Sequence, residues 1–264
     1  MSDQGASVGL VIRQGHDRDP VAGAVVRAVA GPLVAAGKRF VTRSVPDEDA
    51  ELRVYRLWAR TGGVAGVILF EVTADDPRPP LLRQIDMPFV ALAPSTLSVD
   101  FPAVVVDRAA SSAALAAFLD GYPARRRVSV TGTAPAEPLG DELGADDAEA
   151  EVLRTDDIVG ASVRLGVEAR DRGRTVLIVD GDHDAVAVLS ALQNADIRVP
   201  EDVALICRSD SLVCQSASLP ITAIDRRGRE IGAVLGEAAI RAIDDGVLHP
   251  ISTPAPVVVA RETT

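Results

Sequence analysis

The chain has 264 residues, is 47% hydrophobic and carries a net charge of −11 at pH 7. It holds enough apolar residues for one large core or two smaller ones, and no apolar run approaches the roughly 20 residues of a membrane span. A surface this acidic repels phosphate backbones, which excludes nucleic-acid binding by this stretch on its own. The basic residues are one lysine and 26 arginines scattered along the chain, and we attribute them to codon bias rather than to a basic binding surface.

The start of the chain, MSDQGASVGLVI, lacks the basic and apolar regions of a secretory signal peptide. Two cysteines, Cys207 and Cys214, are too few for a disulfide-stabilised scaffold. We therefore expect a cytoplasmic protein.

Short apolar, β-branched runs alternate with helical stretches along the chain. The expected strands are 7–12, 38–44, 64–70, 87–92, 102–106, 126–131, 174–179, 202–207, 221–225 and 256–260, and the expected helices are 20–36, 47–61, 108–120, 156–171, 184–195 and 227–244. Runs such as VAGVILF lack polar alternation, which is typical of strands covered on both faces. The sequence therefore predicts an α/β fold of parallel sheets with right-handed crossovers.

Local signals predict where several helices begin and end. Asp19 before Pro20 predicts a helix N-cap, and Gly37 is expected to end that helix. The Gly31-Pro32 pair predicts a kink or break partway along it. Asp156 and Asp157 are expected near the positive end of the next long helix.

Residues 132–150 differ from the rest of the chain, because they are rich in acidic residues, glycine and proline and show almost no apolar periodicity. We interpret them as a solvated, mobile surface loop. A metal site built from these carboxylates is the alternative, although nothing in the spacing defines its geometry.

Motifs for nucleotide binding and for serine hydrolysis are absent from the sequence. DGDHD (180–184) follows a strand and opens a helix, so it is read as a helix cap or cleft wall, with a metal site as the alternative. Cys207 is read as a buried strand end, with a catalytic thiol as the alternative. We predict no catalytic residue, no metal and no cofactor, and hence a protein that is not an enzyme.

Polar residues follow several of the expected strands. Ligands of open α/β sheets bind just beyond the carboxyl ends of the strands. Such convergence predicts a small-molecule cleft. Asp180 lies at one of these positions, and the candidate effector-binding residues are Arg13, Gln14, Asp17, Glu71, Asp182, Ser209 and Asp210.

The last 65 residues carry a specific family resemblance. IRVPEDVALICRSDS, a following LPITAI and the closing PAPVVVARETT are similar to the carboxyl-terminal part of LacI/GalR-type transcriptional regulators. The family pattern there is V-P-x-D-[VI]-[AS]-[VL]-[VI]-G-[FY]-D-D, then P-x-L-T-T-[VI]. TGGVAGVILF, MPFVALAP, AVVVDRAASSAALAAFL and VDGDHDAVAVLSALQNADIRVP resemble further family motifs, so the resemblance covers residues 7–264 and is weakest at 132–160.

The resemblance implies a periplasmic-binding-protein-like fold of two α/β subdomains with a cleft between them. The expected subdomains are 7–107 plus 226–248 and 108–225 plus 249–264, with crossovers near Asp107–Ala110, Asp225–Arg227 and Gly246–Ile251. In this family the cleft binds a small effector, often a sugar or nucleobase. Its binding changes the DNA affinity of an attached helix-turn-helix head, normally in a homodimer.

The chain also departs from the family pattern. It begins about where the core begins, so the DNA-binding head is absent from it. Cys207 stands at the family's glycine, Arg208 at its aromatic residue and Ser209 at the first aspartate of its Asp-Asp pair. The family's ring-stacking aromatic residue is replaced around Val21-Ala22. Leu92-Ala93 stands at the family's L-D pair and Gly181-Asp182 at its N-D pair. Residues 132–150 replace a family helix that carries an effector-binding arginine. The usual sugar specificity therefore does not carry over to this cleft.

Three readings follow for function. The first is the ligand-sensing and dimerisation domain of a LacI/GalR-type regulator, a homodimer that meets DNA only through its head and does not contact membranes. The second is a solute-binding protein of an uptake transporter, which shares the fold but is disfavoured by the VPEDVAL and RETT segments. The third is a homologue without head or ligand that acts through protein contacts.

Overall fold

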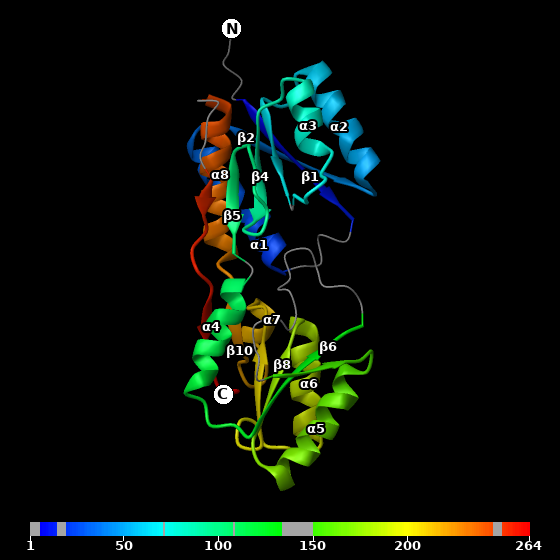
Figure 1. Cartoon of the computed structure of the whole chain (residues 1–264), viewed down its shortest axis with the longest axis vertical. Coiled ribbons are helices and arrows are strands. Elements are labelled where there is room, and N and C mark those ends of the chain that lie inside the picture. The colour runs from blue at the N-terminus through cyan, green and yellow to red at the C-terminus, as the bar shows by residue number, and fades with distance from the viewer. Residues whose placement is uncertain (1–5, 15–19, 71, 108, 134–149, 245–249) are drawn as a thin grey trace. The chain divides into compact units, whose positions relative to one another are not determined.

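The computed structural model describes residues 6–14, 20–70, 72–107, 109–133, 150–244 and 250–264 (Figure 1). The chain divides into two compact units: unit 1 is Met1–Arg108 with Arg227–Pro254, and unit 2 is Ala109–Arg226 with Ala255–Thr264. Each unit is built on one six-stranded, mostly parallel sheet with helices, so the predicted α/β class is confirmed. Among the described helices, none is both long and apolar enough to span a bilayer.

The sheet of unit 1 is parallel throughout and has the strand order β11-β5-β4-β3-β1-β2. Its strands are β1 (Ser7–Arg13), β2 (Arg39–Val45), β3 (Gly66–Leu69), β4 (Phe89–Pro94), β5 (Ala103–Val106) and β11 (Ile251–Ser252). Its helices are α1 (Pro20–Ala35), α2 (Glu48–Thr61), α3 (Arg78–Gln84) and α8 (Gly228–Asp244).

Glycine lets α1 and α8 of unit 1 approach closely on one face of the sheet. A Cβ atom at Gly232 would lie 2.3 Å from the carbonyl oxygen of Val25, so a larger residue there would force the two helices apart. On the other face α2 packs the Trp58 ring against Gly9 of β1, at 2.6 Å from the position of a Cβ atom. The core of this face includes Val11, Tyr55, Leu69 and Leu82.

The sheet of unit 2 has the order β12-β10-β9-β8-β6-β7, and β12 alone among these strands runs antiparallel to its neighbour. Its strands are β6 (Arg126–Thr131), β7 (Glu151–Arg154), β8 (Thr175–Val179), β9 (Val203–Cys207), β10 (Thr222–Asp225) and β12 (Val257–Val259). Its helices are α4 (Ala109–Asp120), α5 (Ile158–Arg172), α6 (Asp182–Asn194) and α7 (Leu212–Gln215).

The two faces of the unit 2 sheet have separate cores. Val128, Leu177, Leu205 and their neighbours pack with residues of α5 and α6, whereas Ile178 and Ile206 pack with residues of α4. The alternation of side chains along each strand produces this division, because successive residues point to opposite faces. Both faces of the central strands are therefore buried, as the continuous apolar runs predicted.

All ten predicted strands are present, with ends shifted by a few residues. The short strands β7 and β11 were not predicted, nor were α3 and α7. α3 has the sequence RPPLLRQ. Its two prolines argue against a helix at the level of sequence, because a helix tolerates proline only in its first turn. α7 has four residues, too few for a detectable period.

Most of the predicted helix ends are confirmed. Gly37 ends α1 in a left-handed conformation with φ 71°, and Asp157 caps α5 by accepting from Gly160 N at 2.9 Å. Of the kink or break predicted at Gly31-Pro32, the break is absent, because α1 continues to Ala35. Pro32 still lacks the N–H that would donate to the carbonyl four residues earlier, but it lies in the last turn and only three helical residues follow it. Asp19 lies outside the described residues, as does most of the 132–150 segment.

The crossings between the units fall after Arg108, Arg226 and Pro254. The third differs from the expectation, which assigned residues 249–264 to the second subdomain. Ile251 pairs with Val104 of β5, so the described residues from Pro250 to Pro254 belong to unit 1. A two-residue strand leaves no apolar pattern that could have predicted this.

Candidate functional site

The carboxyl ends of β8 and β9 in unit 2 carry a cluster of polar side chains. Val179 and Cys207, the last residues of these strands, are paired in register, so the residues that follow them lie at one edge of the sheet. Arg208 N donates to Val179 O at 2.9 Å, which holds the start of the loop after β9 against β8. Asp180, Arg208 and Ser209 are thereby brought together at the strand ends.

Arg208 is a buried cation with an incomplete set of partners. Its residue is 6% exposed, its Nε lies 3.3 Å from Asp180 Oδ1, and its Nη2 donates to Ser129 Oγ of β6 at 3.5 Å. Neither Nε nor Nη1 has a hydrogen-bond acceptor among the described residues. A buried guanidinium normally has its N–H groups paired, because an unpaired buried donor costs about 1–3 kcal/mol.

Ser209 is also buried, and its hydroxyl has no hydrogen-bond partner among the described residues. Its backbone is held by the two thiols: Ser209 N donates to Cys207 Sγ at 3.5 Å, and Cys214 Sγ donates to Ser209 O at 3.6 Å. The backbone position is therefore set while the side-chain oxygen stays open.

The two predicted aspartates of this edge differ in their partners. Asp182 is the first residue of α6, where it is buried and Oδ1 accepts from His183 N at 2.8 Å. Asp210 accepts from Arg261 Nη2 at 2.8 Å and from Gln215 Nε2 at 3.3 Å. Asp210 therefore ties the loop after β9 to the end of the chain.

The geometry opposes a catalytic role for Cys207. The residue is fully buried, and the neighbouring Cys214 thiol, together with burial, raises the pKa of Cys207 well above its usual value. A protonated, inaccessible thiol is a poor nucleophile. Within the described residues, no group of three or more potential ligands could hold a metal ion, and the acidic segment lies outside them.

In unit 1, Arg13 at the end of β1 is occupied by ion pairs with Glu51 at 3.3 Å and Glu48 at 3.5 Å. Gln14 is exposed, and its backbone N–H donates to Val45 O at 2.9 Å. Asp17 and Glu71 lie outside the described residues. Of the four contacts predicted in this unit, the structure therefore describes two, an arginine engaged in ion pairs and an exposed amide side chain.

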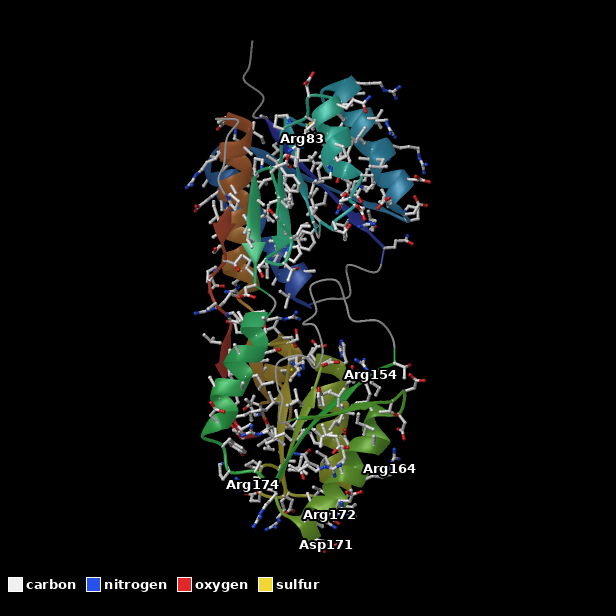
Figure 2. All side chains as sticks on the ribbon, in the orientation of Figure 1. Arg83, Arg154, Arg164, Asp171, Arg172 and Arg174 are labelled. Carbon is white, nitrogen blue, oxygen red and sulfur yellow. The ribbon has the colours of Figure 1, made fainter. Side chains whose placement is uncertain are left out.

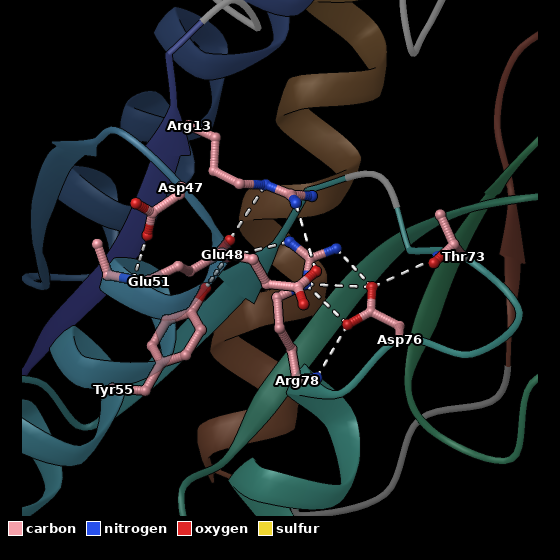
Figure 3. Close-up of polar contacts among 9 residues, drawn as sticks. Arg13, Asp47, Glu48, Glu51, Tyr55, Thr73, Asp76 and Arg78 are labelled. Carbon is pink, nitrogen blue, oxygen red and sulfur yellow. Dashed lines mark hydrogen bonds and ion pairs between the residues drawn. The ribbon is translucent and has the colours of Figure 1, made fainter.

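The ion pair of Arg13 belongs to a buried network around Arg78 (Figure 3). Arg78 is 1% exposed; its Nη2 donates to Asp76 at 2.6 Å, its Nε to the same carboxylate at 2.9 and 3.1 Å, and its Nη1 to Glu51 at 3.0 Å. Glu51 also accepts from Tyr55 Oη at 2.6 Å. The cation is thus enclosed by two carboxylates.

The pKa values of the network follow from these contacts. Burial disfavours the charge of Arg78, but its hydrogen bonds to Asp76 and the charge of Glu51 outweigh this and raise the pKa of Arg78. Burial opposes ionisation of Asp76, but its bonds to Arg78 leave the pKa of Asp76 below its usual value. Burial, with the Glu51 charge, raises the pKa of Tyr55 well above its usual value. The arrangement favours charged Arg78 and Asp76 beside a neutral Tyr55.

Comparison with known proteins agrees with this architecture. Residues 139–264 match the model of the periplasmic binding protein-like domain, and no curated protein matches the chain. A LacI family transcriptional regulator from Bifidobacterium animalis subsp. lactis superposes with a TM-score of 0.78 at 25% identity, over 98% of this chain and 97% of that one. The periplasmic-binding-protein-like fold predicted from the sequence is thereby confirmed, and the chain is similar over almost its whole length to LacI-family regulators.

Two further structures share the fold of this chain. A regulatory protein of the LacI family from Chloroflexus aggregans has a TM-score of 0.75 at 18% identity, over 97% of this chain and 98% of that one. A periplasmic binding protein/LacI transcriptional regulator from Alkaliphilus metalliredigens, complexed with D-xylulofuranose, has a TM-score of 0.69 at 17% identity, over 98% and 99%. These similar structures are described as regulators or binding proteins rather than enzymes.

Sequence reasoning missed the residues whose importance depends on burial. Arg208 was noted as a departure from the family pattern but was not among the candidate contacts, and Ser129 gave no signal. Glu51 lies in α2, Asp76 in the loop before α3 and Arg78 in α3, and no motif links these three residues. For Arg208 a usable signal existed, because a charged residue directly after a continuous apolar strand is expected at the ligand edge.

Proposed function

We propose that this LacI/GalR-type core senses a small molecule at the carboxyl edge of the unit 2 sheet. The observation that carries the proposal is the pair of buried donors at the end of β9, Arg208 Nη1 and Ser209 Oγ, which have no hydrogen-bond partner in the part of the chain that the structure describes. A ligand that supplies acceptors to them recovers the cost of about 1–3 kcal/mol that each unpaired group imposes. The similar structure that holds D-xylulofuranose supports a small-molecule effector for this fold.

We further propose that ligand binding changes the affinity of the protein for DNA, as in a transcriptional regulator of the cytoplasm. The net charge of −11 opposes direct binding of this chain to DNA. In this proposal DNA contact is made by a helix-turn-helix head attached to the core. A shift between two states of the core, favoured differently by the ligand, supplies the coupling.

We infer that the core forms a homodimer through the exposed side of β2 and α1. β2 is an edge strand, and Val41 on it and Val34 on α1 are 36% and 67% exposed. Both side chains, with Phe40, line an open groove of about 710 Å³. An unprotected edge with apolar side chains favours pairing with an identical edge.

The dimer is tested by the molar mass in solution at micromolar concentration. We expect a dimeric mass for the wild type and a monomeric mass for the double variant Val34→Arg, Val41→Arg. Val167→Arg, at an exposed valine of α5 in unit 2, is the matched control and should stay dimeric. A monomeric wild type, or a double variant that remains dimeric, contradicts the interface.

Ligand sensing is tested by thermal-shift screening against sugars, polyols, nucleobases, sugar acids and sugar phosphates. A true ligand raises the melting temperature as its concentration exceeds Kd. Ser209→Ala should weaken that response without loss of stability, because its hydroxyl has no partner, whereas Ser190→Ala on the exposed face of α6 should leave it unchanged. No shift across the library would contradict ligand sensing and favour a homologue that acts through protein contacts.

A further inference from the structure

We infer that the effector carries a small oxyanion, a carboxylate or a phosphate, which pairs with Arg208. This inference rests on the proposed function and names the ligand chemistry of the same site. It starts from a buried positive charge whose described partners do not use its hydrogen-bonding capacity.

The contacts of Arg208 are few and long. The Asp180 carboxylate lies 3.3 Å from Nε without hydrogen-bond geometry, and Ser129 Oγ lies 3.5 Å from Nη2, at the limit for a hydrogen bond. Arg78, which is buried to the same degree, donates at 2.6 to 3.1 Å to two carboxylates. The same side chain can therefore be fully paired inside this protein, and at Arg208 it is not.

A negatively charged acceptor fits this position better than a neutral one. Charge-assisted hydrogen bonds are roughly twice as strong as neutral ones, and a guanidinium binds a carboxylate or phosphate through two parallel N–H groups. The Asp180 oxygen nearest Arg208, Oδ1, is buried, but the pair lacks hydrogen-bond geometry and leaves Arg208 Nε and Nη1 without an acceptor among the described residues. An oxyanion that reaches Nη1 supplies both the missing acceptor and the missing charge.

The acidic residues of this edge do not prevent the binding of an anion. Asp210 is neutralised by Arg261 at 2.8 Å, and Asp180 already faces Arg208. Asp182 accepts a backbone N–H in the first turn of α6, near the positive end of that helix. Its remaining lone pairs suit ligand hydroxyl groups, so the geometry points to a hydroxylated acid or a sugar phosphate.

The experiment compares ligands that share a carbon skeleton and differ in charge. Glucose, gluconate, glucuronate and glucose 6-phosphate are titrated calorimetrically into the full chain at constant ionic strength. We expect at least one charged member to bind at least about tenfold more tightly than glucose. Binding by the gluconate or glucuronate arm identifies a carboxylate, and binding by the glucose 6-phosphate arm identifies a phosphate.

Three variants connect the preference to Arg208. Arg208→Gln should remove it, Arg208→Lys should retain part of it because the charge remains, and Arg172→Gln should leave it intact. Arg172 is the matched control because its side chain is exposed at the carboxyl end of α5, where Figure 2 labels it beside Asp171. Circular dichroism and urea midpoints verify that each variant is folded.

The outcomes separate the inference from the proposed function. Tighter or equal binding of a neutral sugar, with Arg208→Gln unchanged, overturns the oxyanion inference and leaves ligand sensing intact. The absence of binding by every compound here and in the wider thermal-shift library overturns both. Preference for a charged member that survives in Arg208→Gln also overturns the inference, because another group then reads the charge.

Discussion

Among the residues that the structure describes, unit 1 and unit 2 each bury one arginine near the carboxyl ends of their strands, and the two side chains have opposite surroundings. Arg78 is enclosed by Asp76 and Glu51, and Glu51 also pairs with Arg13 and accepts from Tyr55. Arg208 has one ion pair with a partly exposed carboxylate and one long hydrogen bond. The degree of burial is similar, so burial alone does not distinguish a structural charge from a binding group.

What distinguishes them is the balance of donors and acceptors. The hydrogen bonds of Arg78 tie α2 and α3 to the loop before α3 and engage its Nε, Nη1 and Nη2, although Arg13 Nε and Glu51 Oε2 of the same network have no hydrogen-bond partner among the described residues. An unsaturated buried cation such as Arg208 costs stability in the ligand-free protein and recovers that cost when a ligand is bound. The comparison therefore assigns structure to one arginine and recognition to the other.

The largest effect is expected from Arg78→Met. Removal of the cation leaves Asp76 and Glu51 buried without compensation, which should lower the free energy of unfolding of unit 1 by about 3–5 kcal/mol. Trp58, the one tryptophan of the chain, lies in the core of unit 1 and reports its urea transition by fluorescence. A transition that stays within about 1 kcal/mol of the wild type would show that the network is not structural.

An intermediate effect is expected from acid. The pKa of Asp76 is lowered in the folded state, so its stabilising contribution is full above the unfolded value of about 3.9 and is lost as pH falls through the folded value. The Trp58 urea midpoint should therefore decrease steeply below about pH 4. Asp76→Asn should be less stable than the wild type at pH 6 and show a shallower decrease; parallel curves would contradict the assignment.

The smallest effect on stability is expected from Arg208→Met. The side chain has few partners to lose, and Asp180 stays partly solvated. The free energy of unfolding of unit 2 should therefore change by less than about 1 kcal/mol or increase slightly. Far-ultraviolet circular dichroism, compared with Trp58 fluorescence, separates the unit 2 transition from that of unit 1. A loss as large as that of Arg78→Met would make Arg208 a structural residue.

Sequence reasoning predicted the strands well and the site in part, for physical reasons that particular residues illustrate. Val203–Cys207 is a continuous apolar run, which leaves few alternatives to a buried strand, and the residues after it fall at the sheet edge. Ser209 and Asp182 were selected in this way. That Arg13 is occupied by Glu51, or that Arg208 lacks acceptors, depends on contacts between distant segments, which no local pattern contains.

The most direct measurement of the central claim is the side-chain Nε–H resonance of Arg208 in a ¹⁵N-labelled sample, assigned with Arg208→Lys. Titration with the charged ligand that binds most tightly should move this resonance and slow its hydrogen exchange, while the Arg78 resonance, already hydrogen-bonded to Asp76, stays unchanged. Saturable binding that leaves the Arg208 resonance in place would contradict the account.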